Sequence, residues 1–428
     1  MAKKSVSGTN EKVSNYIHDD IVFSILSKLP LKSLKRFGCV RKSWSLLFEN
    51  PLFMNMFRNN FLSKDTSYCH NASFLLQRRI PNIFANDLHS LSGERFENRV
   101  ELNLPDPFQD DDLCRLYLFD ILNVSSTNEF ICVCCHLRDK RFALNVIPRR
   151  PLRRIRFGNR FALWNPTTDE FKVIPQSPAQ FKPFATNVSH DVINFNAGSF
   201  VYGFGYDRVI HDYKVLHQVQ FSAPLLFPDS GYVPLENISL EPVWEIYSLR
   251  SNSWRKLDIV MPTTGGFDNE ARVSIDGVCH WWSWDNTGSF LVSFDLSNEV
   301  FCTTPIPADI GNNFDNGCLW RHLVVLNGSI ALVTYQTQMT LFNISILGEL
   351  SVKESWIKLF IVGPLPCIEF PFGVVKGKIF FVREDKEIAW FDLSTQMIEE
   401  LGVKAESGIN CHIVIYWKNF LPIDGINK

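Results

Sequence analysis

The sequence contains no uninterrupted apolar stretch of about 18 residues, the length that an α-helix needs to cross a bilayer. Its opening residues, MAKKSVSGTNEK, are polar, and no apolar core follows them as it would in a secretory signal. We therefore expect a soluble chain that is not exported and that resides in the cytoplasm, the nucleus or both.

A large excess of charge of either sign is also absent. The 428 residues carry a formal net charge of −2 at pH 7. Proteins that bind nucleic acid or an anionic membrane over a broad surface usually carry a clear positive excess. The nearly neutral balance predicts neither nucleic acid nor a membrane as a partner.

The motifs that mark common catalytic sites are missing. The sequence has no Gly-x-Ser-x-Gly elbow, no Walker-type phosphate loop, no His-Glu-x-x-His, and no pair of carboxylates that spacing singles out. Residues 202–206 include two glycines, but no helical pattern follows them. We predict no catalytic residues and no cofactor.

Paired cysteine spacing, which would mark a disulfide scaffold or a zinc finger, is missing too. Eleven cysteines are scattered singly, apart from Cys132, Cys134 and Cys135 beside His136, which is typical of reduced thiols. A metal site is the alternative for this cluster, but no second ligand pair follows at a suitable spacing. Because residues 130–137 alternate as a buried strand does, we predict apolar cysteines and no metal.

The apolar residues that are present concentrate first near the N-terminus, where more than half of the residues from Tyr16 to Phe57 are apolar. Asp19 and Asp20 suit a first helical turn, and apolar residues follow at helical spacing until Pro30. Further helical patterns occupy residues 31–37, 41–49 and 51–61. A unit this short cannot bury all of its apolar surface, so part of it is expected to bind a partner.

This segment resembles the F-box, the helical module by which substrate receptors attach to the small Skp-type adaptor of cullin ubiquitin ligases. The resemblance covers about Tyr16 to Phe61. The matching positions are Ile25, Leu26, Leu29, Pro30, Ser33, Leu34, Val40, Trp44, Leu47, Pro51 and Phe53. Many family members open with Leu-Pro, where this chain has Ile17 and His18. An ordinary helical cap packed on a neighbouring domain is the alternative.

The resemblance implies an adaptor-binding surface and two partners, a Skp-type adaptor and, through it, a cullin. The residues implied in adaptor binding are Leu26, Leu29, Pro30, Leu31, Leu34, Val40 and Trp44. Trp44 would lie either in that surface or in the core of the module.

Beyond Phe61 the pattern changes to short apolar strands cut by Gly, Asn, Asp and Pro, which indicates an all-β region. A four-strand unit recurs there, and its third strands, centred on Tyr247, Phe294, Phe342 and Phe391, are 47, 48 and 49 residues apart. A propeller blade needs about 40 to 50 residues. Trp164 to Tyr247 spans 83 residues, and the excess in residues 177–199 and 222–243 favours long loops over a hidden repeat.

Turn residues and aromatics recur within the unit. Asp276-Gly277, Asn327-Gly328 and Lys376-Gly377 are predicted to form tight hairpin turns, and Asp295 and Asp392 to begin turns between the outer strands. Large rings are expected to fill the space between blades, with ligand stacking as the alternative. These rings are Trp254, Trp281, Trp282, Trp356 and Trp390.

This second region resembles the F-box-associated interaction domain of plants, a kelch-like propeller. The resemblance rests on LWNPTTDEFKVIP (163–175), YGFGYD (202–207), DYKV (212–215), WEIYSLRSNSWR (244–255), DGVCHWW (276–282) and ESWIKLF (354–360). It is similar in particular to the branch that includes the S-locus F-box proteins of pollen, whose ends also read like HIVIYWKNFLPI. The chain lacks the Gly-Gly doublet that strict kelch blades carry in each repeat. Its pair Gly265-Gly266 falls in an expected loop and not in a repeat strand.

Together the two resemblances imply an α+β multidomain fold: a small three-helix F-box and then an all-β kelch-like propeller of about six or seven blades. The expected divisions are a flexible N-terminus (1–14), the F-box (15–61), the propeller (62–422) and a tail (423–428). The strand from Cys411 to Trp417 is expected to close the ring by pairing with residues 72–77 and 115–120.

The implied function is that of a non-catalytic receptor subunit of an SCF-type ubiquitin ligase, with a protein target of unknown identity. One alternative is a propeller scaffold without ligase attachment. Another is a glycan-binding receptor, in which the exposed member of Trp281, Trp282 and Trp284 would stack on a sugar.

One basic segment stands out, because residues 138–160 hold nine Lys or Arg against the single acid Asp139. It could bind an acidic patch on a target, act as a nuclear import signal, or form a solvated loop. Residues 106–112 contain four aspartates that could neutralise part of it. The candidate substrate-binding residues are Arg149, Arg150, Arg153, Arg154 and Arg156.

Overall fold

The computed structural model of the chain describes residues 17–40, 42–65, 72–80, 85–103, 117–122, 130–137, 160–181, 196–222, 241–262, 267–311, 318–405, 411–420 and 423. The chain divides into two compact units, Met1–Lys64 and Asp65–Lys428. The boundary predicted at residues 61/62 falls inside the last helix of the first unit.

The first unit is helical, and its helices lie where the sequence predicts them. They are α1 (Asp19–Leu26), α2 (Leu31–Gly38), α3 (Lys42–Ser45), the 3₁₀ turn η1 (Leu47–Glu49) and α4 (Pro51–Asp65). Pro30 occupies the N-cap position of α2, where its missing N–H costs nothing. Asn50 caps α4, because its side-chain oxygen accepts the N–H groups of Leu52 and Phe53 at 2.9 and 3.2 Å.

Phenylalanine rings form the core of the helical unit. The Phe53 ring is fully buried, and its centroid lies 5.7 to 6.1 Å from those of Phe23, Phe48 and Phe57. Leu34 and Leu47 are buried as well. Aromatic pairs at these distances add to the free energy of simple area burial, so this small unit has a dense core.

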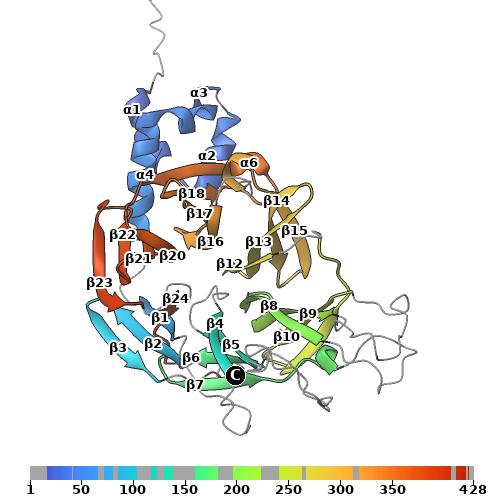
Figure 1. The fold of residues 1–428 in the computed structure, drawn as a ribbon. Helices are drawn as coiled ribbons and strands as arrows, with labels where there is room; N and C mark the ends of the chain where they lie inside the picture. The colour runs from blue at the N-terminus through green and yellow to red at the C-terminus, as the bar shows by residue number, and fades with distance from the viewer. Residues whose placement is uncertain are drawn as a thin grey trace, which may run out of the picture. The chain divides into compact units, whose positions relative to one another are not determined.

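The second unit is a β-propeller of six four-stranded antiparallel sheets (Figure 1). Blade 1 contains β24 (Cys411–Trp417), β1 (Ala72–Ile80), β2 (Ala85–Ser92) and β3 (Asn98–Leu102). Blade 2 contains β4 (Tyr117–Leu122), β5 (Ile131–Leu137), β6 (Arg160–Asn165) and β7 (Glu170–Ile174). Blade 3 contains β8 (Asn196–Asp207), β9 (Asp212–Ser222), β10 (Val243–Ser248) and β11 (Ser253–Leu257).

The remaining blades follow in chain order. Blade 4 contains β12 (Phe267–Ile275), β13 (Val278–Asp285), β14 (Gly288–Asp295) and β15 (Val300–Pro305). Blade 5 contains β16 (Cys318–Leu326), β17 (Ser329–Gln336), β18 (Leu341–Leu347) and β19 (Trp356–Val362). Blade 6 contains β20 (Ile368–Val375), β21 (Lys378–Arg383), β22 (Glu387–Asp392) and β23 (Ile398–Lys404). Short helical turns are η3 (Pro178–Phe181), α6 (Ala308–Gly311) and η5 (Lys353–Ser355).

The repeat spacing correctly identified the third strand of each unit. Trp164 lies in β6, Tyr247 in β10, Phe294 in β14, Phe342 in β18 and Phe391 in β22. The long interval before Tyr247 therefore belongs to blade 3. Residues 182–195 and 223–240 of that interval, and the Gly265-Gly266 pair, lie outside the described residues.

The predicted hairpin turns have the expected backbone. Asp276, Asn327 and Lys376 have φ angles of 54°, 48° and 49°, and the glycine after each also has positive φ. Two consecutive positive φ angles match the twist of the flanking strands. At the outer turns, Asp295 Oδ1 accepts the backbone N–H groups of Ser297 and Asn298 at 2.8 and 2.9 Å, as Asx turns do.

The strand β24 closes the ring. It pairs antiparallel with β1 from Ala72↔Trp417 to Arg78↔Cys411, so the pairing predicted with residues 72–77 is confirmed. The part predicted for residues 115–120 is wrong, since β4 pairs with β5 and supplies the first strand of blade 2. Local sequence cannot tell which of two neighbouring blades a strand joins.

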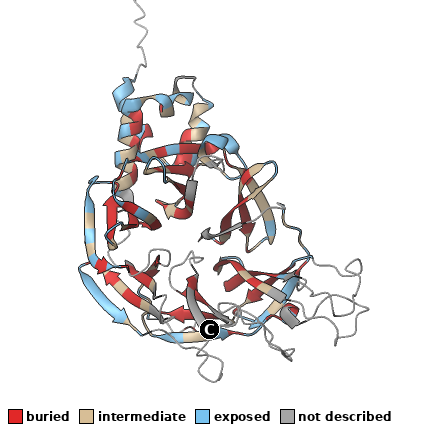
Figure 2. Cartoon of the chain, viewed as in Figure 1, coloured by how far each residue is buried: buried red, intermediate tan, exposed pale blue. Residues whose placement is uncertain are grey.

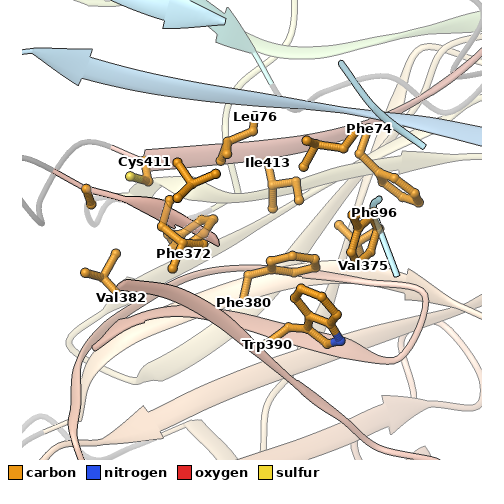
Figure 3. Close-up of a cluster of buried hydrophobic side chains, with 14 residues drawn as sticks. Phe74, Leu76, Phe96, Phe372, Val375, Phe380, Val382, Trp390, Cys411 and Ile413 are labelled. Atoms are coloured by element: carbon orange, nitrogen blue, oxygen red, sulfur yellow. The ribbon is translucent and has the colours of Figure 1, made fainter. Parts of the chain in front are cut away.

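The seam between blades 1 and 6 is apolar. Figure 3 shows Phe74 and Ile413 of blade 1 pointing toward Phe380 and Trp390 of blade 6 in one buried cluster. The two sheets approach closely here, because a Cβ added to Gly373 would lie 2.4 Å from Cγ2 of Ile413. The seam therefore joins the two ends of the propeller sequence by side-chain packing.

The chain after β24 packs on blade 2. Asn165 Nδ2 donates to the Asn419 carbonyl at 2.8 Å, and the Ile423 N–H donates to Glu170 at 3.2 Å. Ile423 is 3% exposed and belongs to the core between blades 2 and 3. Ile423, the first residue of the predicted tail, therefore packs in the core of the propeller.

Strand order defines two faces of the propeller. The first-to-second and third-to-fourth turns of each blade lie on one face, called here the tight-turn face; it includes residues 208–211, 276–277, 296–299, 327–328 and 376–377. The other face, called the loop face, carries the second-to-third connections and the links between blades. β1 is the second strand of its blade, so it begins on the tight-turn face.

Figure 2 shows that burial concentrates in the inner strands, whereas β3 and β23 are largely exposed.

Candidate functional site

The helical unit separates the seven predicted adaptor-binding residues into three groups. Leu26, Leu31 and Leu34 are buried, with exposed fractions of 5%, 5% and 1%. Leu29 and Trp44 are half-buried, whereas Pro30 is exposed and Val40 is 70% exposed. The buried leucines stabilise the unit, and the remaining four are accessible to a partner.

Trp44 is partly packed and partly accessible. Its ring meets Phe37 edge-on, with centroids 6.0 Å apart, while part of the indole stays accessible. Trp44 therefore contributes both to the packing of the unit and to its surface.

Further apolar side chains on this unit are exposed to solvent. Ile21 and Ile25 are 55% and 57% exposed and lie four positions apart on α1, so they share a face of the helix. Val22 and Leu26 occupy the buried face. Other large apolar residues of the unit that are more than half exposed are Ile17, Leu46 and Leu52.

Sequence reasoning did not assign Ile17, Ile21, Leu46 or Leu52 to the binding surface. A signal was present for the isoleucines, because residues 17, 21 and 25 form a second apolar stripe beside the one that contains Val22 and Leu26. A helix of 8 residues packed on one side can bury only one stripe. The second stripe therefore indicates an external partner.

The helical unit also exposes cations close in sequence to these apolar residues. Lys28, Lys32 and Arg36 are exposed, and the last two are four residues apart on α2. Charges at the rim of an interface steer association and select partners. A partner with carboxylates around an apolar patch would complement this surface.

The basic residues proposed for substrate binding, Arg149, Arg150, Arg153, Arg154 and Arg156, lie outside the described residues, and so does the acidic segment 106–112. The described strands on either side of the basic segment are β5, which ends at Leu137, and β6, which begins at Arg160. Both of these ends lie on the loop face.

The packing role predicted for the tryptophans is confirmed for four of them. Trp281, Trp282, Trp356 and Trp390 have exposed fractions of 0% to 6%. Trp254 is half-buried, and its Nε1 donates to the Pro175 carbonyl at 2.6 Å.

Only one of the three tryptophans considered for glycan stacking is accessible. Trp281 and Trp282 are buried, and Trp284 is half-buried and stacks on Trp282 with centroids 4.7 Å apart. The Arg321 guanidinium lies 4.5 Å from the Trp282 ring centroid. This stack has a structural role in the core between blades 4 and 5.

Two cysteines of β5, Cys132 and Cys134, are core residues, whereas the side chains of Cys135 and His136 lie outside the described residues. Cys132 and Cys134 have exposed fractions of 0% and 1%, and burial raises the pKa of the Cys132 thiol to about 12. A thiol must lose its proton to bind a metal, so this environment opposes ligation. Across the described ranges there is no group of three or more His, Cys, Asp or Glu side chains that could hold a metal ion.

No helix in the part of the chain that the structure describes is long and apolar enough to span a membrane.

A six-bladed propeller preceded by a small helical unit is the architecture of this chain. Residues 152–414 match the F-box associated beta propeller domain family, which covers more than half of the sequence. The chain therefore belongs to this family, and its resemblance to plant F-box proteins with an associated propeller is confirmed.

Relatives in Arabidopsis thaliana support the same assignment. F-box protein CPR1 is 24% identical over 57% of this chain and 59% of its own length. A putative F-box protein is 26% identical over 78% of this chain and 71% of its own length. An F-box/kelch-repeat protein is 23% identical over 88% of this chain and 87% of its own length. The match to CPR1 thus covers less than two thirds of that relative.

Proposed function

We propose that this chain is the substrate receptor of an SCF-type ubiquitin ligase. Its helical unit binds a Skp-type adaptor and, through it, a cullin, while its propeller binds a protein target. The observation that supports the proposal is the pairing of an F-box-associated propeller with a helical unit whose second apolar stripe is exposed.

Adaptor binding would bury the exposed apolar side chains of the helical unit. Ile21, Ile25 and Val40 each expose more than half of their surface. Burial of a fully exposed side chain of this kind contributes about 1.5 to 3 kcal/mol, so the part still exposed on each would contribute about 1 to 2 kcal/mol. Pro30, Leu29 and Trp44 extend the proposed surface, and the buried leucines hold its helices in place.

The receptor itself performs no bond chemistry in this proposal. It holds lysines of the target near a charged conjugating enzyme, which raises their effective concentration. The loop face of the propeller is the proposed target-binding face, because the longest connections of blades 2 and 3 begin and end there. The arginines of the segment 149–156 would then contact an acidic patch on the target.

Coexpression with a Skp-type adaptor tests the proposal. Wild-type protein should copurify with the adaptor, and the double variant Ile25→Asp/Val40→Asp should lose it, because two carboxylates would be desolvated in the interface. The pair Leu29→Asp/Pro30→Ala should act in the same direction.

The matched control is Val209→Asp/Val300→Asp, which places the same charge on propeller residues that are 74% and 54% exposed. This control should keep the adaptor and the wild-type melting temperature. Copurification that survives both helical variants would refute the adaptor surface. A wild-type chain that never binds the adaptor would favour the scaffold alternative.

Proteomics of ubiquitin remnants, with and without this chain, would identify the target. Candidate targets are proteins whose ubiquitin-modified peptides become less abundant when the chain is removed. The abundance of these peptides should stay low when the Ile25→Asp/Val40→Asp variant is supplied in place of the wild-type chain.

A further inference from the structure

A row of buried polar side chains crosses blade 3. It runs from Ser199 on β8 through His217 on β9 to Glu245 on β10, and Ser177 joins it from the segment before η3. Their exposed fractions are 3%, 0%, 4% and 1%. Buried polar groups are costly unless they are paired, so this row calls for a specific explanation.

Hydrogen bonds join the two ends of the row, and a close approach of His217 to Glu245 joins its middle, where His217 Nδ1 has no hydrogen-bond partner. Ser199 Oγ lies 2.5 Å from His217 Nε2, and His217 Nδ1 lies 3.5 Å from Oε2 of Glu245. The Ser177 hydroxyl donates to the same Oε2 and in turn accepts the Ala179 N–H at 3.1 Å. His217 and Glu245 are direct partners in the β9–β10 register.

The surroundings of the imidazole are mostly apolar. The Phe161 ring of β6 meets it edge-on at 5.5 Å, and the Trp254 ring of β11 lies at 4.9 Å. β8 contributes the neutral Ser199, and the segment before η3 contributes the neutral Ser177. The charged group that acts on the imidazole is Glu245.

The order Ser-His-Glu is that of a hydrolytic triad, but this one has no access for a substrate. Ser199 is 3% exposed and His217 is fully buried. A nucleophile must reach the reacting carbonyl, with oxyanion donors beside it. The four residues therefore have a structural role and do not contact a substrate.

The four residues lie near the ends of elements on the loop face. Ser177 follows β7, Ser199 is near the start of β8, His217 is in the second half of β9, and Glu245 is near the start of β10. Their contacts therefore connect four strand ends of blades 2 and 3.

Protonation of His217 would disturb these contacts. Burial lowers the pKa of His217, and the nearby Glu245 carboxylate opposes that shift only in part. In the neutral ring one nitrogen can accept from Ser199. In the cation both nitrogens are donors, so the Ser199 hydroxyl would have to become an acceptor, and a positive charge would enter a site that is buried from solvent.

We propose that Ser177, Ser199, His217 and Glu245 form a proton-sensitive clamp, which holds these four strand ends together at neutral pH and releases them on mild acidification. The direction of this pH dependence follows from the difference between the pKa of His217 in the folded and the open state. The ordinary pKa of the imidazole is 6.5 and the folded value is lower, so the clamp is fully formed above pH 6.5 and weakens as the pH falls below it. The clamp does not depend on the proposed ligase function.

Hydrogen–deuterium exchange of the full-length protein at a series of pH values, from about pH 7.5 to about pH 5, tests this clamp. Protection factors corrected for intrinsic rates should fall at least tenfold in peptides that cover residues 177–181, 196–203 and 243–248. Peptides of β21 and β22 in blade 6 should keep their protection. An unchanged blade 3, or a simultaneous loss in blade 6, would overturn the proposal.

Two substitutions separate a proton switch from plain packing. His217→Gln keeps a polar atom near Ser199 but cannot take up a proton, so blade 3 should lose its pH step. Glu245→Gln still accepts from Ser177 but removes the charge that favours the imidazolium, so the loss of protection should begin at the same pH as in the wild type and continue to lower pH. If His217→Gln keeps the wild-type step, or if the loss in Glu245→Gln levels off at the wild-type pH, the clamp is refuted, whatever the stability of each protein.

The matched control is His280→Asn in blade 4. His280 is 1% exposed, its Nδ1 lies 2.8 Å from Ser293 Oγ, and burial lowers its pKa to about 3. It has no part in the blade 3 contacts, so this variant should keep the wild-type step. A step that disappears in this variant would show that the response is not specific to His217.

Discussion

Leu34 and Val40 of the helical unit have opposite surroundings, and they separate folding from binding. Leu34 is 1% exposed in the core, whereas Val40 is 70% exposed. We predict that Leu34→Ala lowers the free energy of unfolding of the helical unit by about 2 to 5 kcal/mol because it leaves a cavity. Val40→Ala should change it by less than about 0.5 kcal/mol. Urea unfolding of the full chain, followed by helical circular dichroism, measures both; equal losses would contradict the assignment.

Gly203 is required by close packing, whereas Gly328 is required by its backbone conformation. A Cβ at Gly203 of β8 would lie 2.1 Å from Sγ of Cys279 on β13, whereas a Cβ at Gly328 would meet nothing within 4 Å although its φ is 71°. We predict that Gly203→Ala destabilises the propeller by about 3 kcal/mol or more, because two packed blades must separate. Gly328→Ala should cost about 1 kcal/mol, from backbone strain alone.

Calorimetric melting of the two glycine variants provides the comparison. The midpoint of Gly203→Ala should fall well below that of Gly328→Ala. The reverse order would mean that blades 3 and 4 do not approach as closely as the structure shows.

At the scale of single elements, the sequence predicted those features that depend on neighbouring residues. Hairpin turns such as Asn327-Gly328 were predictable because positive φ restricts the residues that can occupy them. The helix boundaries near Pro30 and Asn50 were predictable from capping and from proline geometry in the same way.

Features that depend on distant residues were not predictable. The sequence could not show which apolar stripe of α1 is buried, because the helix packs on distant residues such as Phe53 of α4, whose ring meets that of Phe23. It also could not show that β4 belongs to blade 2, or that Ser177, Ser199, His217 and Glu245 meet. Each of these results from packing between segments far apart in the chain.

The outer turns of blades 4 and 6 give a prediction at this scale. Asp392 caps its turn by accepting the Ser394 N–H at 2.8 Å and also pairs with Lys378, whose side chain is 16% exposed. Asp295 caps an equivalent turn. Asp392→Ala should cost about 2 to 3 kcal/mol because a partly buried ammonium loses its partner, and Asp295→Ala about 1 kcal/mol. Urea unfolding measures both, and equal costs would show that the ion pair adds nothing.

At the scale of the whole molecule, the stability of the propeller depends on the pairing of its two ends. β24 supplies the first strand of blade 1, and the cluster that includes Phe74 and Ile413 seals the seam with blade 6. We predict that truncation after Ala405 removes this strand and exposes the seam, so that the protein aggregates or melts without a cooperative transition. Size-exclusion chromatography and calorimetry would show either outcome.

Truncation after Ile423 is the control for this experiment. It keeps β24 and the buried Ile423 side chain, so the protein should elute and melt like the full chain. A truncation after Ala405 that remains monomeric and melts at the wild-type temperature would show that ring closure does not depend on β24.

The central claim is that the helical unit is completed by an adaptor. Isothermal titration of the full-length protein with a purified Skp-type adaptor, repeated at several temperatures, tests it most directly. The account predicts saturable binding of one adaptor per chain with a negative heat-capacity change, because apolar side chains leave water. The affinity should fall at least a hundredfold in Ile25→Asp/Val40→Asp. Absence of binding by the folded wild-type protein, or equal affinity of the double variant, would contradict the account.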